Sequence, residues 1–261
     1  MYPFITVLGR TTGIYQIAML AGIFAAGIYV THVSKKNGYD ENDGIIFLLI
    51  ISAGVLAGGH ILYSIVNYEI LIKVIKSIHV IDSFKNFLNA VYLVWGGNIF
   101  YGGLLGGIFT AAIIFKKRPK YKYLPDIVTP AIPLFHFFGR TGCFFAGCCF
   151  GIESAFGFTF SHSIMEEANG INRFPVQLAE ALLNLLLFIV LDTLRRKNIF
   201  KQNLVYLYLL FYSVARFFLE FLRGDEYRGF IFSLSTSQII SLLVFCFTIP
   251  KIYGLLQGTR R

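Results

Sequence analysis

The sequence places charged side chains at helical spacing inside an apolar stretch near its C-terminal end. Tyr212, Arg216, Glu220 and Arg223 follow one another at intervals of four, four and three residues, so they share one face of a helix. A charge within a membrane span costs about 2.5–3.5 kcal/mol on insertion scales, so such residues usually pair or serve function. Arg216 and Glu220 can pair with each other, and Arg223 is then available to an anion. A structural ion-pair network near the membrane surface is the alternative interpretation.

A further arginine, Arg140, lies in a stretch rich in glycine, cysteine and phenylalanine. If this stretch is helical, Arg140 shares one face with Cys143, Gly147 and Gly151. Glycine allows a backbone or a ligand to approach closely, and the guanidinium presents a planar fork of donors that suits phosphate. We therefore expect Arg140, like Arg223, to meet an anion such as a phosphate head group. A tight helix–helix contact is the alternative.

Two other stretches carry polar groups that such a site needs. Gln177 and Glu180 fall in the first turn of a predicted span, at the same depth as the outer end of the charged helix; helix capping is the alternative for both. Tyr101 precedes the glycine pair Gly102 and Gly103, which opens a gap in the packing where its hydroxyl can act as a donor or weak acid. A packing face of small residues is the alternative there.

Three of the four cysteines, Cys143, Cys148 and Cys149, lie close together in the sequence. A zinc site formed by these cysteines and His136 is one interpretation. The spacing matches no common zinc pattern, and adjacent cysteines rarely chelate one ion well. We therefore expect small, mildly polar packing residues here and no metal.

The composition is that of a membrane protein. Of the 261 residues, 56% are hydrophobic and only 14% are charged, against roughly 25% charged in soluble domains. Several apolar runs reach the ~20 residues that cross a bilayer. We predict one all-α domain over 1–261, a polytopic bundle of helices. Its about seven spans are 12–30, 44–66, 92–115, 124–150, 174–194, 203–222 and 235–256.

The basic residues predict the orientation of this bundle. The net charge of +9 arises largely in short loops between the spans, so topology explains it better than nucleic acid does. Most of the 23 basic residues fall inside if the N-terminus lies outside and the C-terminus inside. We expect the outer segment 67–91 to form a helix on the membrane surface and 152–173 to be a polar outer loop.

These motifs, in this order, resemble those of the prolipoprotein diacylglyceryl transferase family. The family's Tyr-x-x-x-Arg-x-x-x-Glu-x-x-Arg motif is matched in full, and its Pro-x-Gln-Leu-x-Glu, Gly-Arg-x-Gly-Asn-Phe-x-x-Gly and Phe-His-Gly-Gly motifs have similar counterparts. Tyr15 stands where the family has a functional tyrosine in its first span. The chain departs from the pattern at Tyr101, which replaces a histidine, and at Cys143, which replaces an asparagine; Cys148 stands where glutamate is common. The matching stretches are 212–223, 175–180, 139–147 with Gly151, and 100–103.

The resemblance implies transfer of a diacylglyceryl group from phosphatidylglycerol to the lipobox cysteine thiol of a prolipoprotein, with release of glycerol phosphate. It implies a multi-pass protein of the bacterial cell membrane, surrounded by membrane lipids and needing no cofactor. The implied catalytic residues are Arg140, Arg216, Glu220 and Tyr101. The implied substrate-binding residues are Gly102, Gly103, Cys143, Gly147, Gly151, Gln177, Glu180, Tyr212, Arg223 and Tyr15.

Two other functions remain compatible with the same residues. One is a related lipid-phosphate transferase with a different acceptor, which the departures at Tyr101 and Cys143 keep open. The other is an anion or lipid transporter that uses the same arginines. The sequence shows no internal repeat and one cationic cluster, and transporters are often built from repeats, so the enzyme is favoured.

Overall fold

The computed structural model describes residues 3–7, 9–77, 79, 81–97, 99–225, 230–231 and 233–258. Helices dominate this part of the chain. The contacts divide the chain into two compact units. We call residues 1–39 with 125–261 the large unit and residues 40–124 the small unit. The expectation of a single domain stays a prediction.

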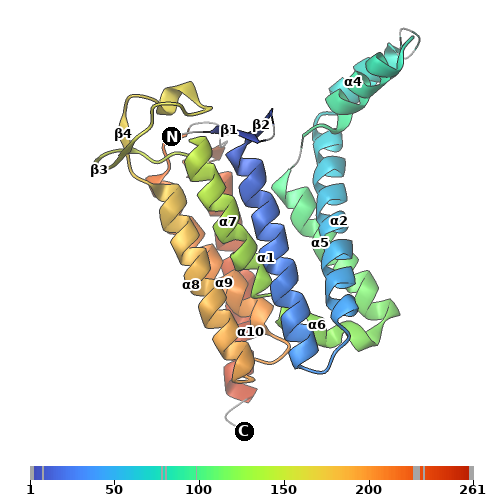
Figure 1. Ribbon diagram of the computed structural model, residues 1–261. Coiled ribbons are helices and arrows are strands. Elements are labelled where there is room, and N and C mark those ends of the chain that lie inside the picture. The colour runs from blue at the N-terminus through green and yellow to red at the C-terminus, as the bar shows by residue number, and fades with distance from the viewer. Residues whose placement is uncertain are drawn as a thin grey trace. The chain divides into compact units, whose positions relative to one another are not determined.

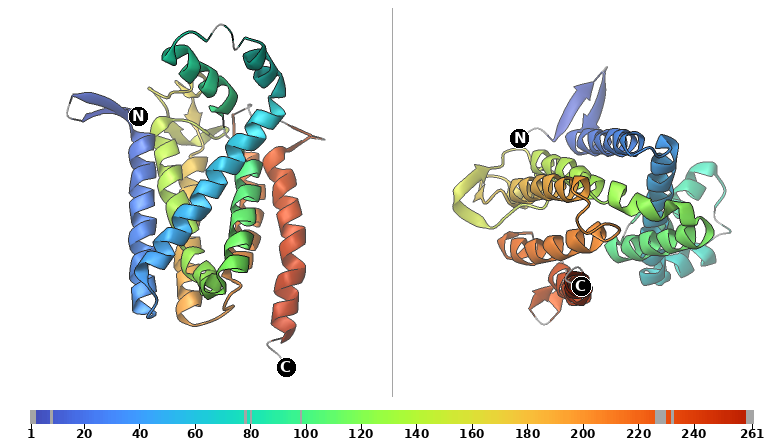
Figure 2. Two further views of the ribbon diagram at one scale, coloured as in Figure 1. Left: turned by 90° about the vertical axis from the view of Figure 1, so that its right-hand side faces the viewer. Right: turned by 90° about the horizontal axis from the view of Figure 1, so that it is seen from below.

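The large unit is a bundle of helices that run side by side (Figures 1 and 2). Helix α1 packs on α7, α7 packs on α8, and α9 packs on both α8 and α10. The short helix α6 precedes α7. The bounds are α1 (Ile14–Lys36), α6 (Leu124–Val128), α7 (Ala131–Ala146), α8 (Val176–Arg196), α9 (Leu204–Leu219) with the 3₁₀ turn η4 (Glu220–Leu222), and α10 (Thr236–Gly258).

Small residues set the distance between α1 and α7. A Cβ added to Gly142 would lie 2.8 Å from the Ala18 Cβ and 3.3 Å from the Tyr15 Cα. A Cβ added to Gly22 would lie 3.1 Å from side-chain atoms of Phe135. Glycine therefore lets these two helices approach closely, which is how membrane helices commonly associate.

In the part of the chain that the structure describes, five helices are long and apolar enough to cross a membrane, and all five coincide with predicted spans. The predicted span 124–150 is divided into two helices, α6 and α7. Helix α7 ends at Ala146 because Gly147 takes a left-handed conformation, with φ of 78°. The five candidates are Ile14–Lys36, Asn42–Val66, Val176–Arg196, Leu204–Leu222 and Thr236–Gln257. The count of seven spans and the orientation stay predictions.

The N-terminal segment and the connections of the large unit contain short strands, so the expectation of an all-α fold needs a correction. Strand β1 (Phe4–Val7) pairs with β2 (Arg10–Gly13), and β5 (Phe230–Ile231) pairs with β6 (Leu234–Ser235), each antiparallel. The segment predicted as a polar loop, 152–173, holds the antiparallel pair β3 and β4 together with the 3₁₀ turn η3. Their bounds are β3 (Glu153–Thr159), η3 (Glu166–Ala168) and β4 (Asn172–Arg173).

The small unit is centred on one close helix pair, α2 and α5. A Cβ on Gly58 would lie 2.2 Å from the Gly102 carbonyl oxygen, and a Cβ on Gly102 would lie 2.2 Å from the Gly58 carbonyl oxygen. Gly54 and Gly106 approach each other in the same way. The glycines therefore allow backbone-to-backbone contact. The bounds are α2 (Glu41–Val66), α3 (Tyr68–Lys76), α4 (Phe84–Trp95), α5 (Phe100–Lys117) and η2 (Pro119–Tyr123).

Two predictions for the small unit were wrong in their boundaries. The predicted surface helix 67–91 is two helices, α3 and α4, because the Ser83 side chain accepts a hydrogen bond from the Asn86 amide at 3.2 Å and starts a new helix. The predicted span 92–115 joins the end of α4 to α5, whereas α4 ends at Trp95 and α5 begins at Phe100. Neither α3 nor α4, each described over its whole length, has a buried residue. Their place on a membrane surface stays a prediction.

Candidate active site

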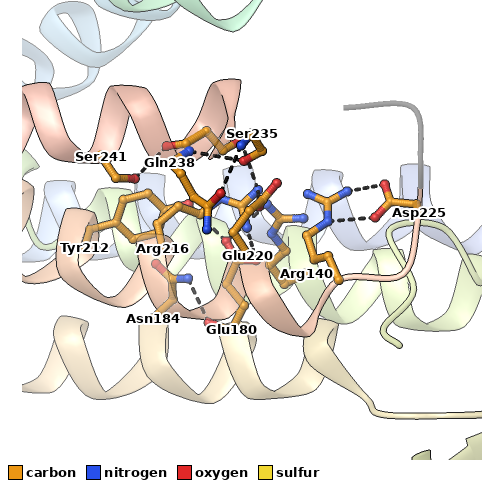
Figure 3. A network of polar contacts seen from close by, with 12 residues as sticks. Arg140, Glu180, Asn184, Tyr212, Arg216, Glu220, Asp225, Ser235, Gln238 and Ser241 are labelled. Carbon is orange, nitrogen blue, oxygen red and sulfur yellow. Dashed lines mark hydrogen bonds and ion pairs between the residues drawn. The ribbon is translucent and has the colours of Figure 1, made fainter. Parts of the chain in front are cut away.

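A cluster of charged side chains lies inside the large unit, where four helices meet (Figure 3). Helix α7 contributes Arg140, α8 contributes Glu180, and α9 with its following turn contributes Arg216 and Glu220. Ser237, in the first turn of α10, completes the cluster. The sequence predicted these four charged residues as site residues, with Arg216 and Glu220 as a pair, and the structure brings all four together.

The buried carboxylate of Glu180 joins the two arginines. Its Oε1 lies 3.1 Å from Arg140 Nη2, and its Oε2 lies 3.8 Å from Arg216 Nη1. The Tyr212 hydroxyl donates a hydrogen bond of 3.0 Å to the same Oε1. The Glu180 side chain is 3% exposed, so these contacts are shielded from water and act in a low dielectric.

Arg216 has a second carboxylate partner. Its Nη2 lies 2.7 Å from Glu220 Oε2 and 3.3 Å from the Ser237 hydroxyl, to which it donates a hydrogen bond. The pairing of Arg216 with Glu220, predicted from their spacing of four residues, is confirmed. Two arginines and two glutamates thus form a network without net charge, in which removal of one member leaves another buried charge uncompensated.

Arg140 and Arg223, which the sequence predicted to be available to an anion, each have a carboxylate neighbour in the structure. Glu180 contacts Arg140, and Asp225 accepts hydrogen bonds from Arg223 Nε, at 2.9 Å, and from Nη2. Although burial lowers the pKa of the Arg223 guanidinium, the hydrogen bonds to Asp225 raise this pKa above its ordinary value. Arg140 is the most accessible of the three arginines, because its side chain is 22% exposed against 10% for Arg216 and 10% for Arg223.

The segment after α7 fixes the ends of α8 and α9 through backbone hydrogen bonds. The Ile152 amide donates to the Leu222 carbonyl at 2.9 Å, and the Gly224 amide donates to the Phe150 carbonyl at 2.9 Å. A Cβ on Gly151 would lie 2.2 Å from the Phe174 carbonyl oxygen. Gly151 therefore has a packing reason, and its predicted contact with substrate stays a prediction.

Gly147 also has a structural reason for its identity. It adopts a positive φ at the end of α7, and a Cβ there would lie 2.5 Å from the Ser163 Cβ. Gln177 connects the start of α8 to the same segment, because its Nε2 donates a hydrogen bond of 2.9 Å to the Cys148 carbonyl. The Gln177 Oε1 is buried and has no hydrogen-bond partner within the described ranges. Gln177 thus retains one acceptor for a ligand.

The remaining predicted residues fall in two places. Tyr15, on α1, lies against Gly142 of α7 and close enough to Arg140 for an electrostatic interaction. Tyr101, Gly102 and Gly103 belong to α5 of the small unit. Gly102 is explained by the contact of α5 with α2, and the role of all three in substrate binding stays a prediction.

Sequence reasoning missed three polar residues of this region. Tyr208 stacks on Tyr212, with ring centroids 5.6 Å apart, and its hydroxyl lies 3.3 Å from His136 Nδ1. The sequence could have indicated Tyr208, because it precedes Tyr212 by four residues and so shares its helix face. Asp225 was signalled only by its nearness to Arg223, and Ser237 had no signal in the sequence.

The three neighbouring cysteines also come together. The Sγ atoms of Cys143, Cys148 and Cys149 all lie within 4.8 Å of one another. The turn at Gly147 and the left-handed conformation of Cys149, with φ of 54°, reverse the chain so that its sulfur returns to Cys143. The argument from spacing against a shared metal therefore does not hold for this geometry.

Apolar helices around a buried network of arginines and glutamates define a helical membrane protein with a polar site within its helices. The model of the family described as prolipoprotein diacylglyceryl transferase matches residues 3–253, and the chain belongs to this family. It is 34% identical to a phosphatidylglycerol–prolipoprotein diacylglyceryl transferase of Clostridium tetani, over 90% of this chain and 92% of that protein. It is 32% identical to such a transferase of Clostridium perfringens, over 91% and 90%, and 32% identical to one of Helicobacter hepaticus, over 90% and 81%.

Proposed function

We propose that this chain transfers the diacylglyceryl group of phosphatidylglycerol to the cysteine thiol of a prolipoprotein and releases glycerol phosphate. The observation that carries the proposal is the contact of Arg140 and Arg216 with one buried carboxylate, Glu180. Family membership and the names of the relatives support the same reaction.

Arg140 is the proposed contact for the phosphate of the lipid. A guanidinium has five N–H donors. In Arg140, one terminal nitrogen, Nη2, lies 3.1 Å from Glu180 Oε1. The partial exposure of Arg140 leaves other donors for a ligand. As the carbon–oxygen bond breaks, negative charge develops on the departing phosphate, and a fixed cation in a water-poor site stabilises this charge.

Arg216 is the proposed second cation. Because both arginines contact the same Glu180 carboxylate, their guanidinium groups lie close together, and we propose that a single phosphate contacts both. Glu220 and Ser237 hold Arg216 in place. The carboxylates thus position the cations before substrate binds, so little reorganisation is needed during the reaction.

Other residues are proposed to hold the substrates. The unpartnered Gln177 Oε1 suits a donor such as a hydroxyl of the glycerol head group. Tyr15, close to Arg140, is proposed to contact the same lipid. We retain the following residues as proposed substrate contacts: Gly102, Gly103, Cys143, Gly147, Gly151, Glu180, Tyr212 and Arg223, with Tyr101 as a hydroxyl that takes part in catalysis.

The thiol of the acceptor is the nucleophile in this reaction. Its thiolate attacks the glyceryl carbon that carries the phosphate, a thioether forms, and glycerol phosphate leaves with the electron pair of the broken bond. The acceptor cysteine is proposed to lie in the lipobox of a signal peptide. The protein is proposed to cross the bacterial cell membrane seven times, with the N-terminus outside and the C-terminus inside.

The test is the reaction itself. Purified protein is incubated with phosphatidylglycerol and a lipobox peptide, and mass spectrometry follows the peptide. We expect the mass of a diacylglyceryl thioether, together with released glycerol phosphate. A matched peptide with serine in place of the cysteine serves as control and stays unmodified. Release of glycerol phosphate without modification of the peptide would contradict the proposed acceptor and favour a related transferase with another acceptor.

A further inference from the structure

The cluster of Cys143, Cys148 and Cys149 has the dimensions of a metal site. Its three Sγ atoms lie within 4.8 Å of one another. A zinc ion with zinc–sulfur bonds of about 2.3 Å holds its sulfur ligands roughly 3.8–4.0 Å apart. Small rotations of the side chains therefore bring the three sulfurs to the separation that one ion requires.

The fold holds the backbone of this cluster from several sides. Cys143 is buried on the last turn of α7, and Cys149 adopts a left-handed conformation that is rare for a residue with a side chain. Gln177 binds the carbonyl of Cys148, and the Gly224 amide binds the carbonyl of Phe150.

The electrostatic surroundings suit a thiolate–metal group. Arg140 and Arg223 lie close enough to Cys149 to act on its charge. Three thiolates and one divalent cation carry a net charge of about −1 by formal count, and the guanidinium groups of Arg140 and Arg223 lie near this charge, although each also contacts a carboxylate. The same arrangement places the cluster next to the residue proposed to bind the phosphate of the lipid, Arg140.

We propose that Cys143, Cys148 and Cys149 bind one thiolate-preferring divalent cation, with zinc as the best fit, and leave its fourth position to the acceptor thiol. Zinc sites that carry out chemistry have three protein ligands and one open position. The metal site stands on the geometry of the three thiols, whereas the identity of the fourth ligand rests on the proposed function.

The bonds and charges of the resulting step balance. The acceptor thiol loses its proton to solvent when it binds the cation. Its sulfur then forms a bond to the glyceryl carbon, the carbon–oxygen bond breaks, and the electron pair leaves with glycerol phosphate. The thioether product is uncharged and a weaker ligand than a thiolate, so it can be released. No separate base is then required to deprotonate the acceptor thiol. This is consistent with Tyr101, which stands where the family has a histidine.

The first experiment measures metal without reference to activity. The full chain is purified in detergent under reducing conditions without chelator, its metal content is determined, and Co²⁺ is then exchanged into it. We expect about one zinc per chain and, with cobalt, the sulfur-to-metal charge-transfer absorption of a thiolate site. The variant Cys148→Ser should lose both signals, and Cys246→Ser, which alters the exposed cysteine of α10, should keep both.

Two results would overturn the metal site. One is the absence of stoichiometric zinc or cobalt in reduced protein that retains its helical content. The other is a disulfide between two of these cysteines in protein isolated directly from membranes. Transferase activity that persists in metal-free protein would leave the proposed function standing and remove the proposal for the cysteines.

A second experiment tests the open position. A lipobox peptide added to the cobalt protein should change the visible absorption bands, because a fourth sulfur joins the metal. The peptide with serine in place of cysteine should leave the bands unchanged. Identical spectra with both peptides would refute the open position.

Discussion

Two helix contacts in this protein are built in opposite ways. One is the contact of α2 with α5, and the other is the contact among α7, α8 and α9. In the first, Gly54, Gly58, Gly102 and Gly106 remove side chains so that two backbones touch. In the second, Arg140, Glu180 and other long charged side chains fill the space between helices. Close packing is a sufficient reason for the four glycines, whereas apolar residues would fill the second contact at lower cost in free energy. The proposed function is therefore based on the charged contact among α7, α8 and α9.

The largest effect is expected from Glu180→Gln. This change keeps the shape of the side chain but removes the carboxylate that Arg140 and Arg216 share. Breaking a buried ion pair from one side costs about 3–5 kcal/mol, and we expect a loss of this size in the free energy of unfolding in detergent micelles. The exposed Glu166→Gln is the control and should leave stability unchanged. If Glu180→Gln and Glu166→Gln were equally stable, the shared Glu180 carboxylate would not stabilise the buried arginines.

Arg140→Ala should reduce turnover strongly, and it should also cost stability, because Glu180 and Glu220 then share Arg216 as their cation. We expect a rate lower by about 10²–10³, which corresponds to about 3–4 kcal/mol of transition-state stabilisation. Arg140→Lys should also be damaging, since lysine keeps the charge but loses the planar fork. The measurement is peptide modification under single-turnover conditions. As a control, Arg196→Ala removes a cation that is 67% exposed and should stay within about twofold of the parent. A normal rate for Arg140→Ala would refute its role at the phosphate.

Gly58→Ala should show the reverse pattern. Its Cβ would lie 2.2 Å from a backbone oxygen of α5, so the helices must move apart. Overpacking of this kind costs about 1–3 kcal/mol, measured as the free energy of unfolding. The control is Gly254→Ala in α10. A Cβ there has no described atom within 4 Å, so we expect no loss in the free energy of unfolding. If Gly58→Ala left the free energy of unfolding unchanged, the contact of α2 with α5 would not depend on glycine at this position.

The smallest change tests topology alone. Single cysteines are placed at Arg118 and at Glu166, both exposed, in a background without native cysteines. An impermeant thiol reagent added to intact cells should label position 166 and not position 118, because the outer segments carry fewer basic residues. Labelling at 118 alone would reverse the orientation. Both positions should react after the membrane is permeabilised.

Local patterns in the sequence predicted several features correctly. The apolar runs marked the five long helices, because a backbone in lipid must satisfy its hydrogen bonds within the segment. The spacing of four residues between Arg216 and Glu220 predicted their contact, since both lie on one helix. The family motifs predicted Arg140, Glu180 and Tyr212 as site residues, and only the structure shows that the three are in contact.

Only the tertiary structure decided which charges compensate each other and where the chain turns. Glu180 joins Arg140 to Arg216 because three helices far apart in the sequence meet at that depth, and helical spacing holds no information about such contacts. The cysteines cluster because the chain reverses after Gly147, a turn that depends on the backbone conformation of Cys149. Periodicity reports which residues share a face of one element, whereas the partner of that face is set by packing between elements.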